Sequence, residues 1–354
     1  MSAAPTIEPI IEADLPIVDP HHHLWFRPEA VIQALEQHRN LMTRALMPGF
    51  RRRARYLLDE FLADLRTGHN VGATVYVEVQ SMYRTSGPEA MRSVGEVEFA
   101  NGMAAMAASG AFGDVAVCAG IVGSVDLRLG DAAKDVLLAH VQAGGGRYRG
   151  IRAQAVVFDE DAEALGPQIQ GVPHLMLDRK FRQGFRHLEP LGLSYDAWQL
   201  EYQLRELIDL ARAFPRTQII VNHVGGLFGL GTHSGQTQQR FAEWRGNIAA
   251  LAGCPNVAMK LGGLGMPTCA LPSSFASTPP SSLELARDWK PYIETCIEAF
   301  GVERCMFESN YPVDAATTSY AVLWNAFKRI VGAASATEKT ALFSGTARRI
   351  YRID

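Results

Sequence analysis

The sequence predicts a (β/α)₈ barrel, the TIM-barrel fold, formed by residues 1–354 as a single domain. A chain of 354 residues that is 47% hydrophobic is long and apolar enough to build a large core. Eight short apolar runs are bounded by turn residues, and segments with helical periodicity separate most of them. Several runs are apolar at both even and odd positions, which is typical of parallel strands covered on both faces. Eight such strand and helix units close most economically into a barrel.

The expected strands span 16–19, 73–80, 115–122, 150–158, 191–198, 217–223, 256–262 and 304–310. The expected helices cover 95–109, 132–143, 202–214, 241–252, 285–300 and 319–331. After the first strand, residues 27–70 form an insertion with helical character, which we expect near the barrel mouth. The segment 266–282 is rich in Pro and Ser and is expected to be a lid or an ordered loop.

An open, doubly wound sheet is the competing architecture. Such a sheet usually has a glycine-rich turn after its first strand, but the sequence HHHLWF occupies that place at 21–26. The glycine clusters at 225–231 and 262–267 lack the spacing and the downstream acid of a dinucleotide fingerprint. We therefore expect barrel loops at both clusters and no nucleotide site.

Composition and charge exclude several classes of function. The formal net charge of −3 provides no general attraction for nucleic acid, and the cluster Arg51, Arg52, Arg53 and Arg55 is expected to be a solvated helix face. No stretch is suited to span a membrane, and the first residues lack the pattern of a signal peptide. Five cysteines without a CxxC pair argue against a disulfide framework and a thiolate zinc site. We expect a cytoplasmic protein whose partner is a small-molecule substrate, and a homo-oligomer is compatible with the sequence.

Polar side chains stand at the carboxyl end of nearly every expected strand. In a barrel these ends converge on one mouth, where catalytic residues are found. Unrelated core strands would instead scatter charged and imidazole groups along their length. The candidates for a common site are His21, His23, Glu78, Arg152, Asp196, Asn222, His223, Lys260, Glu308 and Asn310.

The His-x-His pair at the first strand is the most specific single indication of a functional site. On an extended strand, His21 and His23 point the same way and His22 points outward, so the pair can bind one metal ion. Asp19 is a candidate to orient one of the two imidazole rings. The alternative is a loop in which three adjacent histidines are bonded to backbone groups.

Four motifs together are more specific than any of them alone. They are DPHHHLW at 19–25, VNHVGG at 221–226, NVAMKLGG at 256–263 and CMFESNYPVD at 305–314. The set resembles the amidohydrolase superfamily, and in particular its amidohydrolase-related branch of barrel lactonases and decarboxylases. FSGTARRIYR at 343–352 resembles the closing helix of that branch, and the resemblance spans residues 16–352.

The resemblance implies a hydrolase with imidazoles from strands one and six and an acid from strand eight. These groups hold a divalent metal or act directly on a carbonyl. By position, His21 and His23 match the first-strand pair and His223 matches the sixth-strand histidine, so these three are the implied metal ligands, with Zn²⁺ as the expected ion. Arg152 resembles an arginine that binds an acidic substrate group, although a salt bridge at the barrel rim also explains it.

The eighth strand departs from the family pattern. Asn310 stands where the family has an aspartate, and an amide neither takes a proton from water nor supplies negative charge to a metal. Catalysis without a metal is therefore a second possibility. Glu308 lies two residues earlier on the same strand face, and we expect it to supply the missing carboxylate. Asp314 is a second candidate if the following loop folds back, and an ion pair of Glu308 with Lys260 is the structural alternative.

Further residues are expected to line the substrate site. Lys260 lies near the mouth, where it binds substrate or, in another enzyme class, forms a Schiff base. Glu78 is expected either to orient a ligand or to pack against Arg152. Trp25 and Tyr311 are candidates to wall a pocket for a ring, although such aromatics often belong to the core.

Together these expectations describe a lactonase-like hydrolase that opens a cyclic ester of a small acidic, sugar-derived or aromatic-derived compound. His21, His23 and His223 polarise the carbonyl, Glu308 or Asp314 takes the proton of the attacking water, and Asn310 makes an orienting hydrogen bond. Three alternatives remain open: a metal-assisted decarboxylase of an aromatic or muconate-type acid, a Lys260 Schiff-base aldolase, and a barrel that binds a ligand without catalysis.

Overall fold

Eight parallel strands form a nearly closed barrel, which confirms the predicted fold. The computed structural model describes residues 8–37, 41–154, 172–234 and 237–354. Each strand pairs in parallel with the next one in the chain, so the order around the sheet is sequential. The barrel strands are β1 (Ile17–His22), β4 (Val71–Val77), β5 (Ala116–Gly123), β6 (Tyr148–Gln154), β7 (Ser194–Trp198), β8 (Ile219–Val221), β9 (Val257–Leu261) and β10 (Cys305–Phe307).

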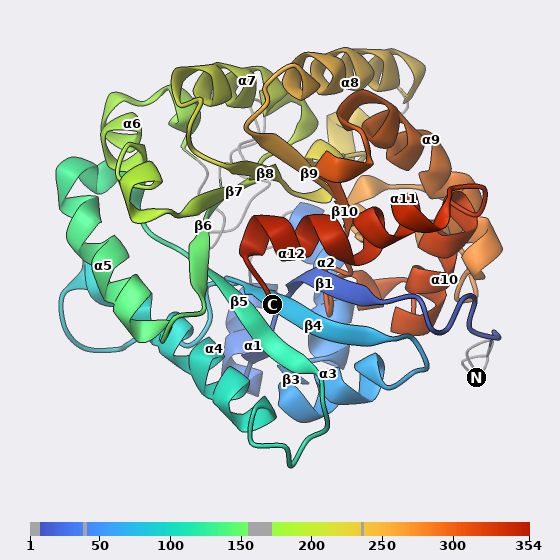
Figure 1. The fold of residues 1–354 in the computed structure, drawn as a ribbon, viewed down its shortest axis with the longest axis horizontal. Helices are drawn as coiled ribbons and strands as arrows, with labels where there is room; N and C mark the ends of the chain where they lie inside the picture. Colours follow the sequence, from blue (N-terminus) through green and yellow to red (C-terminus); the bar gives the residue numbers. More distant parts are fainter. Residues whose placement is uncertain (1–7, 38–40, 155–171, 235–236) are drawn as a thin grey trace.

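Helices surround the strands, as Figure 1 shows. All six predicted helical segments form helices, namely α4 (Val94–Ala107), α5 (Ala133–Ala143), α7 (Leu204–Ala213), α8 (Thr237–Ala252), α9 (Ser282–Phe300) and α10 (Tyr320–Ile330). The sequence did not predict α6 (Arg179–Phe185), because seven residues are too few to show helical periodicity. The end of the predicted strand 150–158 lies outside the described residues.

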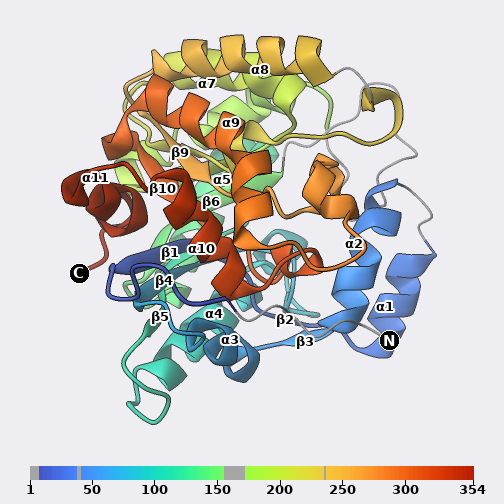
Figure 2. The same ribbon diagram turned by 90° about the vertical axis from the view of Figure 1, so that its right-hand side faces the viewer.

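The predicted insertion lies at the mouth. It contains α1 (Glu29–Glu36), α2 (Leu41–Arg52), α3 (Leu58–Leu65) and the unpredicted strand β3 (Arg55–Tyr56), which pairs with β2 (Trp25–Phe26) just before the insertion. Figure 2 shows α1 and α2 at the end of the molecule opposite the C-terminus. Arg51, in the last turn of α2, is 48% exposed and pairs with Glu29 and Glu36, as expected for a solvated helix face. The expectation is wrong for Arg53, which lies beyond the helix, is 29% exposed and pairs with Asp64, and for Arg55, which belongs to β3. The segment 266–282 is a loop with two short 3₁₀ turns, which agrees with the ordered-loop expectation.

The first and last strands meet through backbone hydrogen bonds beyond the end of β10. The Asn310 N–H donates to the His21 carbonyl at 2.9 Å, and the His23 N–H donates to the Tyr311 carbonyl at 2.7 Å. The residues that close the barrel are therefore the same residues that the sequence assigns to the site.

Side chains of the strands alternate between two apolar clusters. Ile219, Val257 and Phe307 belong to the outer cluster, between strands and helices. Ile220, Ala258 and Met306 belong to the inner one. The inner cluster also contains Tyr351 of α12 (Thr346–Tyr351), which follows α11 (Ala336–Thr340). Because this cluster includes Val18 and Ala73, near the amino ends of β1 and β4, α12 closes the bottom of the barrel.

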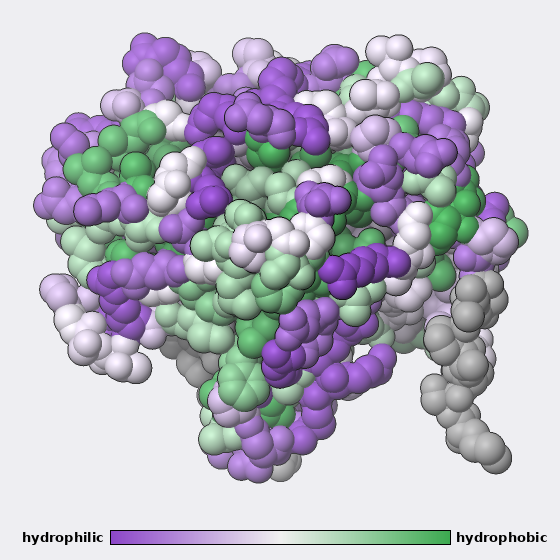
Figure 3. All heavy atoms as spheres, turned by 60° about the horizontal axis from the view of Figure 1, so that its bottom comes forward, coloured by the Kyte–Doolittle hydropathy of each residue, from purple (hydrophilic) through white to green (hydrophobic). Residues whose placement is uncertain are grey.

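Polar and apolar side chains are interspersed on the face drawn in Figure 3. No helix in the described part of the chain is long and apolar enough to cross a membrane. All five cysteines lie in described segments as buried thiols, and none is in a disulfide. The expected cytoplasmic location and homo-oligomer stay predictions.

Glu96 of α4 fixes the loop that follows β4. Its Oε1 accepts hydrogen bonds from the Val79 N–H at 2.8 Å, the Ser81 N–H at 3.0 Å and the Tyr76 hydroxyl at 3.0 Å. Burial raises the pKa of this carboxyl to about 8, with Glu78 adding negative charge nearby. One buried acid thus holds the backbone just after Glu78.

We predict that Glu96→Gln flattens the pH dependence of stability. The folded pKa is about 8 against 4.5 for the exposed group, so the native state keeps a proton that the unfolded chain releases. The contribution of Glu96 to the free energy of unfolding is therefore complete below about pH 4.5 and falls as the pH rises towards about 8. The Gln amide oxygen can accept the same three hydrogen bonds.

Urea unfolding at several pH values across this range measures the effect. The exposed Glu89, changed to Gln, provides the control and should keep the wild-type pH dependence. Equal pH slopes for wild type and Glu96→Gln would contradict the assignment.

Candidate active site

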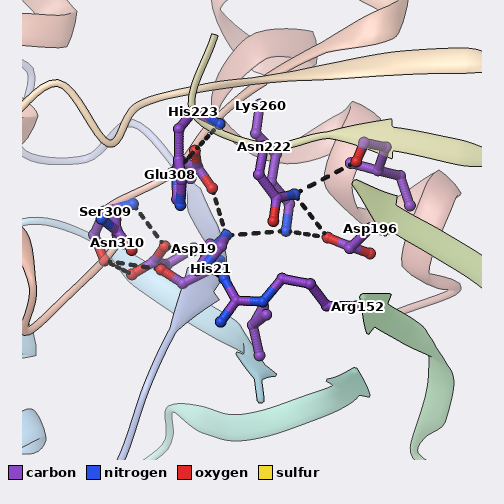
Figure 4. A network of polar contacts seen from close by, with 12 residues as sticks. Asp19, His21, Arg152, Asp196, Asn222, His223, Lys260, Glu308, Ser309 and Asn310 are labelled. Carbon is purple, nitrogen blue, oxygen red and sulfur yellow. Dashed lines mark hydrogen bonds and ion pairs between the residues drawn. The ribbon is translucent and has the colours of Figure 1, made fainter. Parts of the chain in front are cut away.

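A polar layer lies directly above the apolar layer inside the barrel. The apolar layer includes Ile220, Ala258 and Met306. The polar layer, two residues further along the same strands, contains Asn222, Lys260 and Glu308. Side chains two residues apart point to the same side of a strand, so these polar groups must enter the barrel interior. All three are buried, and Figure 4 shows them converging from different strands.

The ion pairs join strands that are not neighbours. Lys260 on β9 is 2.7 Å from Asp196 on β7, and Arg152 on β6 is 2.7 Å from Glu78 after β4. In a barrel, each layer of inward side chains is contributed by alternate strands, which explains both pairings. The alternative of an ion pair between Lys260 and Glu308 on adjacent strands is therefore wrong, whereas the packing of Glu78 against Arg152, one of the two expected roles of Glu78, is confirmed.

Glu308 lies between two histidines at the centre of this layer. Its Oε1 accepts hydrogen bonds from the backbone N–H of His223 at 3.0 Å and from His223 Nδ1 at 2.7 Å. Its Oε2 is 2.7 Å from His21 Nδ1. That contact lacks the alignment of a hydrogen bond, so Oε2 has no hydrogen-bond partner among the described residues. The closing strand thus provides a buried carboxylate, as the sequence predicted.

Two glycines after β9 make room for this arrangement. A Cβ on Gly262 would lie 2.4 Å from Cγ of Glu308, and a Cβ on Gly263 would lie 2.4 Å from Cγ of His223. Gly263 also has a φ of +67°, which other residues rarely adopt. The glycine cluster that the sequence places in a barrel loop is needed for the close approach of Glu308 and His223.

Two positively charged side chains flank His21. Lys260 Nζ is 3.3 Å from His21 Nδ1, and an Arg152 guanidinium nitrogen is 3.3 Å from His21 Nε2. The pKa of His21 lies well below its ordinary value, because burial removes water and because Lys260, His223, His23 and Arg152 add positive charge around it. His21 is therefore a neutral imidazole at neutral pH.

His23 lies beside His21 but is oriented differently. The two ring centroids are 4.9 Å apart, and His23 Nδ1 is bonded to the Val77 carbonyl at 2.7 Å. His22 points away from this pair, as expected, and stacks on Phe61. Trp25 stacks behind His23 and is fully buried. The structure gives no support to Trp25 as a wall of the substrate pocket.

Asn310 and Asp314 form a unit next to the histidines. The loop folds back as expected, and Asn310 Nδ2 donates to Asp314 Oδ1 at 2.7 Å. The Gly265 N–H donates to the other oxygen of Asp314. Burial raises the pKa of Asp314 well above its usual value, and both of its carboxylate oxygens already accept hydrogen bonds within the protein. Tyr311 is buried and donates its hydroxyl to the Thr318 carbonyl at 2.6 Å, so its contacts are internal.

Asp19 orients backbone and hydroxyl groups and does not contact an imidazole nitrogen. It accepts hydrogen bonds from the Ser309 hydroxyl at 2.6 Å, the Ser309 N–H at 3.0 Å and the Tyr320 hydroxyl at 3.1 Å. Burial raises its pKa to about 6. The expected role in orienting an imidazole is wrong, and Asp19 instead holds the segment that follows Glu308.

His21, His223 and Glu308 form a group that can hold a metal ion. Each offers one ligand atom, and these atoms lie within 4.8 Å of one another. Two imidazoles and a carboxylate are a donor set that zinc accepts. Oε2 of Glu308, which is buried and has no hydrogen bond among the described residues, is suited to contact a cation. His23, the third predicted ligand, lies outside this group.

Sequence reasoning missed one residue of this network. The Tyr351 hydroxyl, from α12 at the bottom of the barrel, donates to Asp196 Oδ1 at 2.8 Å. Tyr351 lies in the segment that resembles a closing helix, but no local pattern shows that its side chain reaches the polar layer. The contact arises because α12 packs against β1, β10 and the inner apolar cluster.

Three comparisons with known proteins agree with this architecture. A family model described as amidohydrolase matches residues 18–353. A protein of Sinorhizobium fredii, y4mH, is 33% identical over 344 residues, covering 96% of this chain and all of that protein. An L-fucono-1,5-lactonase of Burkholderia multivorans is 27% identical over 241 residues, covering 68% of this chain and 73% of the lactonase.

A solved structure supports the fold. It is an amidohydrolase from Burkholderia multivorans with bound zinc, with a TM-score of 0.70 and 24% identity, and the match covers 96% of this chain and 99% of that one. The family match spans nearly the whole chain, and a relative of full length shares one third of its residues. The chain therefore belongs to the amidohydrolase family.

Proposed function

We propose that the protein is a lactonase that hydrolyses a sugar-derived cyclic ester. The observation that carries this proposal is the buried Glu308 carboxylate between His21 and His223 at the mouth end of the barrel, with Lys260 and Arg152 beside His21. The similarity to L-fucono-1,5-lactonases supports the choice of a lactone.

The contacts of the Arg152 guanidinium favour a neutral sugar lactone over an acidic one as the substrate. Its Nε donates to Glu78 Oε1 at 2.7 Å, and a terminal nitrogen donates to the Glu78 backbone carbonyl. Its planar face also lies over the Trp198 ring. A guanidinium whose charge is already paired gains less from binding a substrate carboxylate than an unpaired one would.

In the proposed reaction, Glu308 accepts a proton from the attacking water. Oε1 is fixed by two donors of His223, which leaves Oε2 to take the proton. The water oxygen bonds to the carbonyl carbon, the ring C–O bond breaks, and Glu308 returns the proton to the leaving alkoxide to give a hydroxy acid. The positive charges of Lys260 and Arg152, which lie beside His21, favour the negative charge that develops on the carbonyl oxygen without contacting it.

The residues His21, His223 and Glu308 would hold a zinc ion in this site. Such an ion supplies a Lewis acid for the carbonyl oxygen. Neutral His21 is in the form that binds metals, because only an unprotonated nitrogen has a lone pair to offer.

The alternatives receive less support. Lys260 is fully buried and donates to Asp196, so its amine is not presented to a carbonyl carbon as a Schiff base requires. A decarboxylase is distinguished by release of carbon dioxide without consumption of water. A barrel without catalysis would bind a lactone with no turnover and would gain nothing from Asn310→Asp.

We predict that Glu308→Gln lowers kcat for lactone hydrolysis by about 10²- to 10⁴-fold, the usual contribution of a proton-accepting side chain. The amide keeps the shape and can still accept from His223, but it cannot take a proton from water. A pH-indicator assay on L-fucono-1,5-lactone and related sugar lactones measures the rate.

The control for this variant is Glu29→Gln, which alters a carboxylate of α1 that is 61% exposed. It should keep wild-type turnover, and circular dichroism should show that both variants are folded. Full retention of lactonase activity by Glu308→Gln, or the absence of turnover on every lactone tested, would exclude the proposal.

We further predict that the purified protein contains about one zinc per chain and that His223→Ala loses it. Elemental analysis by mass spectrometry measures the metal, and dialysis against a chelator should reduce lactonase activity in parallel. His174→Ala, at a surface histidine, should retain the metal. A metal-free protein with undiminished turnover would assign the chemistry to the side chains alone.

A further inference from the structure

Tyr351 connects the bottom of the barrel to the polar layer. Its side chain is fully buried in the inner apolar cluster. Its hydroxyl donates to Asp196 Oδ1 at 2.8 Å, and Lys260 Nζ lies 5.2 Å from the centre of its ring. The residue therefore contacts both members of the Asp196 and Lys260 ion pair from below.

One carboxylate oxygen of Asp196 accepts hydrogen bonds from side chains of three other elements. Besides the Tyr351 hydroxyl, Oδ1 accepts Lys260 Nζ at 2.7 Å and Asn222 Nδ2 at 3.1 Å. Lys260 Nζ also reaches His21 Nδ1 at 3.3 Å. A continuous path of polar contacts thus runs from Tyr351 through Asp196 and Lys260 to the imidazole beside Glu308. Figure 4 shows the part of this path from Asp196 to His21.

Packing alone does not account for a tyrosine at this position. A hydroxyl that is buried among apolar side chains loses its hydration, and that loss is offset only by a hydrogen bond. Phenylalanine would fill the same space without that cost. Tyr195 provides a comparison within the chain, because its buried hydroxyl has no hydrogen-bond partner in the described structure. The Tyr351 hydroxyl, in contrast, is aimed at a carboxylate.

We infer that Tyr351 is a positioning residue of the active site, which acts through Asp196 to hold the Lys260 ammonium against His21. The helix that closes the barrel thereby helps to set the charge distribution around the catalytic carboxylate. This inference rests on the proposed function for its kinetic readout, but not for its spectroscopic one. Tyr351 lies a layer below the substrate and touches none of the reacting atoms.

The test compares Tyr351→Phe with the matched control Tyr195→Phe, since each variant removes one buried hydroxyl from the same kind of ring. We expect Tyr351→Phe to lower kcat for lactone hydrolysis by about 10- to 100-fold. This factor corresponds to the free energy that one hydrogen bond to a charged group contributes. KM should stay within about twofold, because substrate contacts are unchanged. Tyr195→Phe should change neither constant.

A double-mutant cycle separates this role from loss of packing. If Tyr351 acts through Lys260, then Tyr351→Phe should cost little additional activity in a Lys260→Met background, whereas independent effects would multiply. The ring ¹⁵N signals of His21, assigned by their loss in His21→Ala, provide a readout that needs no substrate. We expect these signals to shift in Tyr351→Phe and not in Tyr195→Phe.

The outcomes separate failure of this inference from failure of the lactonase proposal. A shift of the His21 signals in a protein that turns over no lactone would uphold the positioning role and exclude the proposed activity. Unchanged His21 signals in folded Tyr351→Phe would overturn the inference, whatever the activity. If that variant does not fold, Asp196→Asn, which keeps an acceptor for the Tyr351 hydroxyl, must shift the same signals, and unshifted signals there would overturn the inference as well.

Discussion

The contact of the buried Glu308 carboxylate with His21 and His223 is the interaction on which the rest of the site depends. Both contacts are 2.7 Å, and the carboxylate and the His21 ring are fully buried. A buried carboxylate is costly unless donors or a cation surround it, so the strands that carry these residues must approach closely. Gly262 and Gly263 permit that approach, because a side chain at either position would collide with Glu308 or His223.

The distribution of buried charge is uneven around this carboxylate. Asp196 pairs with Lys260, and Glu78 pairs with Arg152. Among the described residues, Glu308 has no lysine or arginine within ion-pair distance and faces two imidazoles instead. Negative charge is therefore concentrated between two imidazoles, which suits either a divalent cation or a proton in transfer. The Lys260 ammonium and the Arg152 guanidinium lie beside His21 instead.

The barrel is closed at the same place where the site is assembled. Backbone hydrogen bonds from Asn310 and His23 join the last strand to the first, just where His21 and Glu308 enter the interior. At the other end, α12 fills the bottom and brings Tyr351 to Asp196. The polar layer thus lies between the backbone hydrogen bonds that close the barrel and the helix α12 that fills its bottom. Both restrict the movement of its side chains, as catalysis by preorganised charges requires.

The sequence by itself determined the eight barrel strands and six of the helices, because short apolar runs bounded by turn residues and helical periodicity can be read locally. It also placed Glu308, His21 and His223 at strand ends that meet. Only the tertiary structure decided the partners: Lys260 contacts Asp196 and not Glu308, and Tyr351 arrives from the opposite end of the barrel. Pairing depends on the stagger of alternate strands and on how a distant helix packs beneath them, and neither leaves a local pattern in the chain.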